Sequence, residues 1–213
     1  PRAGYPVEIQ ALWILLLRQL HEIGVPPADR PWTELATLAS DSFNQLFWLD
    51  DKGWFADLLI GGPNTPAADC VVDNALRSNC LFAISLGLAD DEKARRCVEA
   101  ARRYLIVPGA LRSLAPLPVS PPLAIHGANG QPLNDPNNPY WGRYEGDEDT
   151  RRKPAYHNGT AWTWTFPTFC EALVRAYDSK PEAAAAARDY LFTMVQLMTD
   201  GCLGQIPEVL DGD

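Results

Sequence analysis

Histidine and paired cysteine are scarce in this chain of 213 residues. It has three histidines, His21, His126 and His157, and none of them forms an HExxH pair. The five cysteines stand at long spacings without a CxxC pair. An odd number of scattered cysteines is typical of a reduced cytosolic protein rather than of a disulfide framework. The sequence therefore predicts no metal, no cofactor and a cytoplasmic location.

Basic charge and long apolar runs are also lacking. Eighteen Lys and Arg against 27 Asp and Glu give a net charge of −9, which argues against binding nucleic acid or an anionic membrane. The longest strongly apolar run, residues 11–17, is too short to cross a bilayer, and no basic segment precedes it as in a secretory signal. Neutral ligands such as sugars remain compatible with this composition.

Helical periodicity dominates what is present, and 46% hydrophobic residues suffice for one core, so we expect a single domain over residues 1–213. The first predicted helix is apolar on nearly every side, as expected inside a larger assembly, and the second is amphipathic. Short β segments are expected near residues 47–60 and 200–210. The predicted helices cover residues 7–23, 31–48, 74–86, 90–105, 165–178 and 181–199.

One long stretch, residues 107–156, has no helical periodicity and is rich in proline and glycine. An irregular segment of this length inside a compact domain is usually functional or disordered. We expect a surface excursion with a mobile part at residues 117–139. That part buries little apolar area to offset the entropy of ordering it, so it should be dispensable for folding.

Aromatic rings and polar groups are concentrated in AYHNGTAWTWTFPTF, residues 155–169. Large rings are mostly buried, and their N–H groups seek partners. Two interpretations stay open. The rings could form a buried core under a loop, or a sugar platform that covers the C–H face of a pyranose while nearby amide, imidazole and carboxylate groups bind its hydroxyls. The segment GQIPEVLDGD, residues 204–213, is the expected partner of this stretch.

Four motifs carry a resemblance to a known family. YHNGTAWTWTFPTFCEALVRAY (156–177) resembles the YHxGTxWxWxxxPFxEA segment in the C-terminal amylo-α-1,6-glucosidase region of glycogen debranching enzymes, in particular the bacterial and archaeal type. PRAGYPVEIQALWI (1–14), LRSNCLFAISL (76–86) and GQIPEVLDGD (204–213) match further motifs in the family's order. The resemblance implies an all-α fold, an (α/α)6 toroid of which this chain covers about half.

The resemblance also implies roles for individual residues. Glu208 lies in IPEVLDGD, where the family has SEIxDGD, and is the expected general base of an inverting α-glucosidase acting on α-1,6 branch stubs of glycogen-like glucans. The expected general acid is an aspartate that in the family shortly precedes the first motif, hence upstream of Pro1. The side chains expected to bind substrate are Glu8, Arg77, Asn79, Tyr156, His157, Asn158, Trp162, Trp164 and Asp211.

Alternatives remain at several of these positions. Glu8 also fits a first-turn carboxylate that complements the helix dipole. An arginine in an apolar helix, as at Arg77, usually pairs with a carboxylate, and Asp57 fits a partner of backbone groups. The family has RPNQ where this chain has RSNC, so Ser78 and Cys80 depart from its pattern.

The function as a whole has alternatives too. The chain could be a catalytically incomplete fragment or a carbohydrate-binding relic, or a related α-glucosidase of the glucoamylase or trehalase type. The expected partners are an oligosaccharide and the remainder of the same toroid.

Overall fold

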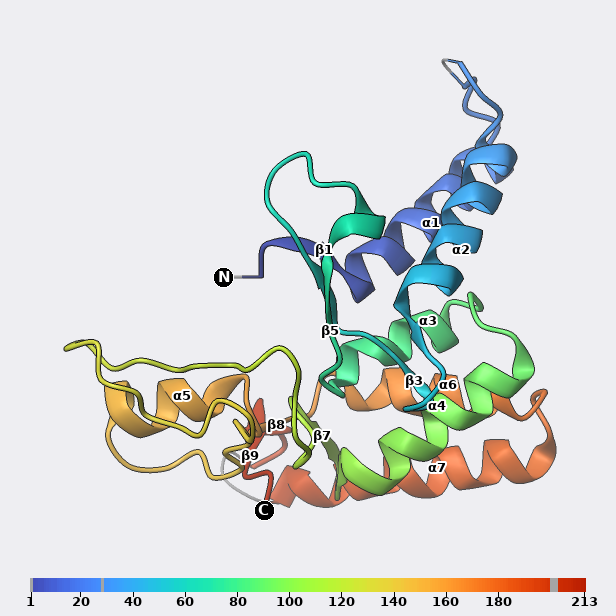
Figure 1. Cartoon of the computed structure of the whole chain (residues 1–213). Coiled ribbons are helices and arrows are strands. Elements are labelled where there is room, and N and C mark those ends of the chain that lie inside the picture. The colour runs from blue at the N-terminus through green and yellow to red at the C-terminus, as the bar shows by residue number, and fades with distance from the viewer. Residues whose placement is uncertain (1, 28, 200–202) are drawn as a thin grey trace.

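A computed structural model describes residues 2–27, 29–199 and 203–213, which contain seven α-helices (Figure 1). Pro1 and residues 200–202 lie outside the described residues. Residues 200–202 belong to the predicted C-terminal β segment. The helices are α1 (Val7–Glu22), α2 (Trp32–Phe47), α3 (Leu81–Ser85), α4 (Asp91–Tyr104), α5 (Lys153–Tyr156), α6 (Phe166–Ala176) and α7 (Pro181–Gln196).

Nine short strands in the described residues form three small antiparallel sheets. They are β1 (Gly4–Pro6), β2 (Trp48–Leu49), β3 (Trp54–Phe55), β4 (Leu58–Ile60), β5 (Val71–Asp73), β6 (Ile106–Val107), β7 (Ala110–Arg112), β8 (Ala161–Trp162) and β9 (Val209–Leu210). The sheet orders are β1-β4-β5, β2-β3 and β6-β7-β8-β9. The expectation of strands only near residues 47–60 and 200–210 was wrong, because segments of two or three residues are too short to show a period of two.

The longer helices form two groups (Figure 1). Helices α1 and α2 lie side by side and run in opposite directions, and α6 contacts α3, α4 and α7. Helix α4 begins where Asp90 accepts a hydrogen bond from the Lys93 backbone N–H at 2.9 Å, which is a helix N-cap. Periodicity predicted these long helices correctly, within one to three residues at each end.

The structure corrects the predicted helix at residues 74–86. Residues 71–73 form β5, and the helical part consists only of a 3-10 turn (Ser78–Cys80) and α3. The backbone before this turn bonds to distant segments instead: Asn74 N–H donates to Ser120 O at 2.9 Å, and Leu76 O accepts from Ala115 N at 2.9 Å. These bonds replace the intrahelical bonds that the periodicity predicted.

The 107–156 excursion is more ordered than predicted. Besides β6 and β7 it contains a π-helical turn (Glu148–Arg152) that leads into α5, and the Asp147 side chain caps this turn by accepting from Asp149 N and Thr150 N. Within residues 117–139, Val119 is buried and its N–H donates to Asn137 O at 2.9 Å. Whether that segment is mobile and dispensable stays a prediction.

One part of the main core lies where α2 meets the β2-β3 hairpin. Phe43 stacks on Phe47 with ring centroids 4.9 Å apart and on Phe55 at 5.2 Å. All three rings are at most 3% exposed. Their burial anchors α2 against the rest of the chain.

Helix α1 has two apolar faces. Val7, Ala11, Ile14 and Leu17 are buried, whereas a second stripe stays in solvent. The exposed stripe is Ile9, Leu12, Trp13 and Leu16, with exposures of 43–51%.

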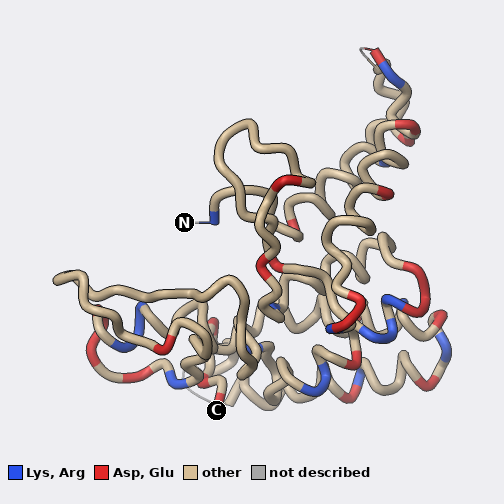
Figure 2. The backbone as a smooth tube through the Cα atoms, viewed as in Figure 1, with Lys and Arg blue, Asp and Glu red and all other residues tan. Residues whose placement is uncertain are grey.

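In contrast, Figure 2 shows acidic and basic residues side by side along α4. Among the described residues, no helix is both long and apolar enough to pass through a membrane.

Replacing Phe43 by alanine should lower the free energy of unfolding by about 3–5 kcal/mol, because truncating a buried Phe leaves a cavity between two stacked partners. Leu38→Ala is the matched control on the same helix: Leu38 is 47% exposed, and its loss should change stability by less than about 0.5 kcal/mol. Urea unfolding followed by circular dichroism measures both. Equal effects of the two substitutions would contradict this assignment of the core.

Candidate active site

Two segments far apart in the sequence are joined by strands β8 and β9. Ala161 pairs with Leu210 and Trp162 with Val209. Next to this pairing, the Thr163 hydroxyl donates to Pro207 O at 2.7 Å. The aromatic segment and the GQIPEVLDGD loop therefore lie together, near α5 (Figure 1).

An aromatic cluster surrounds this junction. The His157 and Trp162 rings stack with centroids 5.7 Å apart and an interplanar angle of 6°. Tyr156 lies edge-on to both, at 4.8 and 4.6 Å, and Tyr144 is 5.6 Å from Tyr156. Trp162 Nε1 donates to Tyr156 O at 3.0 Å, which fixes the indole.

The two interpretations of the aromatic segment apply to different residues. Phe166 and Phe169 are fully buried and belong to the core. Tyr156 and Trp162 are half-buried, His157 is exposed, and Trp164 is 58% exposed. Only the second group can meet a ligand.

Glu208 is exposed beside this cluster. Its backbone carbonyl accepts from Thr163 N at 3.3 Å, which holds the residue next to Trp162. Burial first, and then the negative charge of Glu208, raise the pKa of Tyr156. The carboxylate of Glu208 thus acts electrostatically on the Tyr156 phenol.

The loop after Glu208 is tied to the 107–156 excursion. Asp211 Oδ1 accepts from the Tyr144 backbone N–H at 2.8 Å. The carbonyl of Gly212 accepts from Arg112 Nε at 2.6 Å and from the Tyr140 hydroxyl at 3.0 Å. Asp211 therefore positions Tyr144 with one carboxylate oxygen.

Arg77 holds the YHNGT loop, residues 156–160, in place by hydrogen bonds. Its guanidinium donates to the carbonyls of Ser113, at 3.2 Å, and His157, and to Asn158 Oδ1 at 3.2 Å. Its Nε lies 3.5 Å from Asp57 Oδ2, so the expectation that Arg77 pairs with a carboxylate is confirmed. Most of the donors of Arg77 are thus used within the protein.

Asp57 is 2% exposed and joins Arg77 to the N-terminal motif. Its Oδ1 accepts from Arg2 at 3.0 Å, and Arg2 also pairs with Glu8. Burial raises the pKa of Asp57 to about 6, against the opposing effects of Arg77 and Arg2. Partial burial, Arg77 and Arg2 lower the pKa of His157, which favours a neutral ring at pH 7.

Of the predicted site residues, Tyr156, His157, Trp162, Glu208 and Asp211 lie in one place. Three others contribute differently. Glu8 connects to this place through Arg2, Asp57 and Arg77, Asn158 uses its side chain to bond Arg77 and Pro154, and Asn79 is half-buried in the 3-10 turn before α3. For these residues substrate contact stays a prediction.

Sequence reasoning missed Arg2 and Tyr144 as members of the site, and gave Asp57 only a backbone role. Arg2 lies in the first motif and Tyr144 in the YEGD part of the excursion, so both had a signal. The role of Asp57 had none, because it depends on two arginines distant in sequence.

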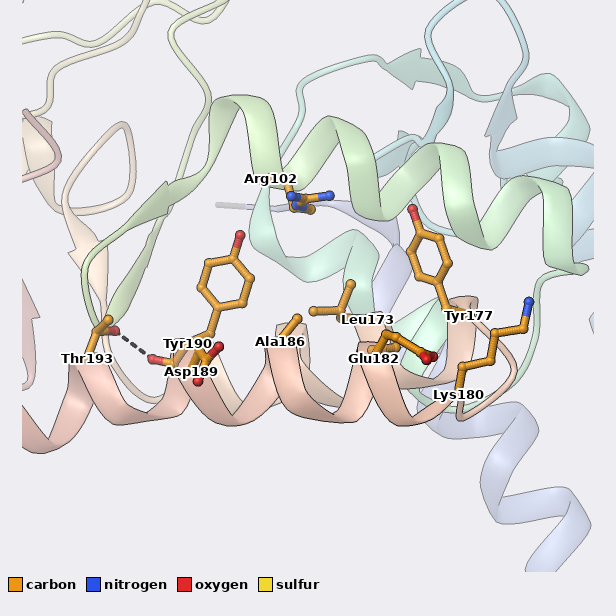
Figure 3. Close-up of a pocket in the computed structure, with 10 residues that line it drawn as sticks. Arg102, Leu173, Tyr177, Lys180, Glu182, Ala186, Asp189, Tyr190 and Thr193 are labelled. Atoms are coloured by element: carbon orange, nitrogen blue, oxygen red, sulfur yellow. Dashed lines mark hydrogen bonds between the residues drawn. The ribbon is translucent and has the colours of Figure 1, made fainter.

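Two of the hollows formed by the described residues bear on the choice of a substrate site. One of about 420 Å³ adjoins the aromatic cluster and is lined by Tyr144, Glu148, Arg152, Lys153 and Tyr156. A larger one of about 600 Å³ lies between α4 and the α6–α7 pair, where Arg102, Tyr177 and Tyr190 line it (Figure 3). The larger hollow contains none of the predicted site residues, so the smaller one is the better candidate for substrate.

Comparisons with known proteins identify a family and a similar fold. A family model described as amylo-alpha-1,6-glucosidase matches residues 1–120 and 128–213. Among solved structures, neutral trehalase Nth1 from Saccharomyces cerevisiae is similar in fold, with a TM-score of 0.60 and 17% sequence identity. That match covers 97% of this chain and 34% of the trehalase chain, so the chain spans about a third of that protein's length. No curated protein matches in sequence.

The family match includes most of the stretch 117–139, and only residues 121–127 fall outside it. The hydrogen bond from Val119 N–H to Asn137 O therefore joins two residues in the matched part of the chain.

Gly159→Ala should destabilise the protein by about 2–5 kcal/mol, the sum of left-handed strain and overpacking. Gly159 has φ +153°, and an added Cβ would meet the backbone of Trp141 and, at 2.8 Å, Gly142 N. Gly204→Ala is the control, since Gly204 also has a positive φ, of +78°, but no atom of the described residues lies within 4 Å of an added Cβ. Thermal or urea unfolding of both variants checks this. The prediction is wrong if Gly159→Ala costs no more than Gly204→Ala.

The raised pKa of Asp57 predicts a pH-dependent stability. The folded protein holds this proton up to about pH 6, whereas the unfolded chain releases it near pH 4. The stabilisation is therefore complete below pH 4 and is lost as pH rises through 6. Relative to Asp57→Asn, the wild type should lose about 3 kcal/mol between pH 4 and pH 7 in urea unfolding. A constant difference across this range would show that Asp57 is ionised throughout.

Proposed function

Because the chain belongs to the amylo-α-1,6-glucosidase family, we propose that it forms part of an inverting glycoside hydrolase that removes α-1,6-linked glucosyl stubs from glycogen-like glucans. One observation carries the proposal: the exposed Glu208 lies beside the cluster of Tyr156, His157 and Trp162. The four free cysteines among the described residues fit action in the cytoplasm.

The cluster suits a neutral sugar. Trp162 and His157 offer ring faces for the C–H side of a pyranose, and the neutral imidazole can exchange hydrogen bonds with its hydroxyls. The adjoining hollow of about 420 Å³ falls within the range of about 300–1,000 Å³ common for small-ligand sites. Its cations Arg152 and Lys153 are paired with Glu148, which favours a neutral polyhydroxy ligand over an anion.

In the proposed mechanism Glu208 is the general base. Its carboxylate takes a proton from water, the water oxygen attacks the anomeric carbon, and the glucan oxygen leaves with a proton from a general acid on the other face. An exposed carboxylate suits the base, because it must be ionised at working pH.

The general acid needs another source. Asp57 is buried with a raised pKa, as an acid should be, but Arg2 and Arg77 occupy its two oxygens and it is 2% exposed. A glycosidic oxygen cannot reach it. We propose that the acid comes from a segment outside these 213 residues, as the family resemblance implies.

The rest of an (α/α)6 toroid is the proposed partner. The exposed stripe of α1 consists of large apolar side chains, which a soluble monomer seldom leaves uncovered in one row. Packing further helices on α1 would bury this stripe, and would also explain why the chain spans about a third of the trehalase chain that it resembles.

In the whole protein, Glu208→Gln should lower glucan hydrolysis by about two to four orders of magnitude, the usual effect of losing a general base, and leave oligosaccharide binding nearly unchanged. Release of glucose from a branched limit dextrin measures turnover, and calorimetry measures binding. Glu171→Gln is the control: Glu171 is an exposed carboxylate on α6, outside the site.

Activity on other substrates distinguishes the alternative functions. Preference for maltose or trehalose over the branched dextrin would refute the debranching specificity while keeping the hydrolase. Binding of glucans without hydrolysis by the whole protein would instead favour the carbohydrate-binding relic.

A further inference from the structure

A continuous chain of charged contacts links two parts of the candidate site. Glu8 pairs with Arg2, Arg2 donates to Asp57 Oδ1 at 3.0 Å, and Asp57 Oδ2 lies 3.5 Å from Arg77. Arg77 then donates to the His157 carbonyl and to Asn158 Oδ1. Each carboxylate oxygen of Asp57 therefore serves a different side of the site.

The backbone of Asp57 is fixed as well. Its N–H donates to Asp73 O at 3.1 Å, and its carbonyl accepts from Val7 N–H at 3.0 Å, at the start of α1, and from Arg2 at 2.9 Å. Neither the residue nor its side chain can shift without moving the first turn of α1. Asp57 is thus a rigid point between Glu8 and the YHNGT loop.

We propose that Asp57 is a positioning residue: through Arg2 and Arg77 it fixes Glu8 relative to His157 and Asn158, so that both sides of the sugar site keep one separation. The proposal rests on the proposed function for its substrate, but the mechanical link is independent of it. Asp57 itself touches no substrate, because it is buried under the two arginines.

Stability alone is a poor explanation for this arrangement. Burying ions is costly, and well-packed apolar residues would often stabilise a fold as much or more. Two arginines on one buried carboxylate fix directions that apolar side chains would not, because a guanidinium is planar and its donors point in set directions. The geometry of the site is what the ion network provides.

The link also responds to pH. The charged groups that face Asp57 are Arg2, Arg77, Asp73 and Glu8, and the Cys80 thiol lies close enough for the charge of Asp57 to affect it. The arginines stay charged, so protonating Asp57 leaves them opposite a neutral carboxyl. Both links then lose their ionic component together on the acid side of pH 6, although the fold is not destabilised there, because the pKa of Asp57 is raised in the folded state.

Asp57→Asn in the whole protein tests this. The amide keeps the shape but turns an NH₂ group towards one of the arginines. Turnover should fall about 100-fold, as expected when reacting groups are misplaced by about 1 Å. The acid limb of the wild-type pH profile near pH 6 should vanish in the variant. Asp50→Asn is the control: Asp50 pairs with Arg96 at 2.7 Å but is on the surface, and its loss should change neither readout.

Hydrogen exchange tests the link between Glu8 and the YHNGT loop without measuring catalysis. In Asp57→Asn, amides of residues 4–9 and of residues 155–160 should both exchange at least about tenfold faster, since removing one partner of a buried pair costs several kcal/mol locally. Helix α4 should be unchanged. If the variant does not fold, Arg2→Lys, which keeps the charge but loses the planar pair of donors to Asp57 and Glu8, should loosen the same two segments.

Faster exchange on one side only, or evenly everywhere, would overturn the positioning role. So would wild-type turnover in Asp57→Asn when Glu208→Gln is inactive, and this result would leave the proposed function standing. Conversely, coupled loosening of both segments in a protein that hydrolyses no glucan would support the link and refute the function.

Discussion

The buried carboxylate of Asp57 is the constraint on which the site depends. Moving an ion out of water is so unfavourable that its partners must be placed well, and here Arg2 and Arg77 each pair with a different oxygen of the carboxylate. Arg77 also bonds the carbonyls of Ser113 and His157. The start of α1, the turn before α3 and the YHNGT loop are thereby held to one point, although each belongs to a different part of the sequence.

The second constraint is close approach of backbone. The loop after Glu208 passes over the YHNGT loop at Gly159 and Gly212, where the carbonyl of Gly159 stands within van der Waals contact of Gly212. A side chain at Gly212 would separate these two loops, and one at Gly159 would push away the backbone of Trp141 and Gly142. Strands β8 and β9, of two residues each, can pair only because the loops approach this closely. The glycines thus allow the loop that carries Glu208 to approach the aromatic cluster. The ion network of Arg2, Asp57 and Arg77 fixes the position of the YHNGT loop.

The parts of the fold that could be predicted are those with a long repeating pattern. Helices α1, α2, α4, α6 and α7 each bury one face over several turns, so their periodicity was readable. Residues 74–80 were misassigned because a distant partner determines their backbone bonds, as when Asn74 N–H donates to Ser120 O. Residues 148–156 were misassigned because a side-chain cap, Asp147, starts the π-helical turn. The short strands also depend on distant partners, so their sequences did not reveal them.

The features of the site can likewise be divided into those that were predictable from the sequence and those that were not. The proximity of Trp162 and Glu208 was predictable from the resemblance, because two motifs of one family were expected to meet. The carboxylate partner expected for Arg77 is present, but the bonds by which Arg77 and Asn158 hold the YHNGT loop could not be predicted, because they join segments distant in sequence. Sequence motifs mark residues that are needed but do not separate those that touch a ligand from those that hold the shape.

One helix connects the site to the proposed remainder of the toroid. Glu8 lies in the first turn of α1, and the exposed stripe from Ile9 to Leu16 begins at the next residue. Whatever packs on that stripe restrains the axis of α1 and therefore the position of Glu8. Because Glu8 is connected through Arg2 and Asp57 to the loop that carries His157, packing on α1 and the geometry of the sugar site are mechanically coupled. A rigid ion network makes sense in this position, since it transmits a restraint from one side of the site to the other without needing a continuous strand or helix.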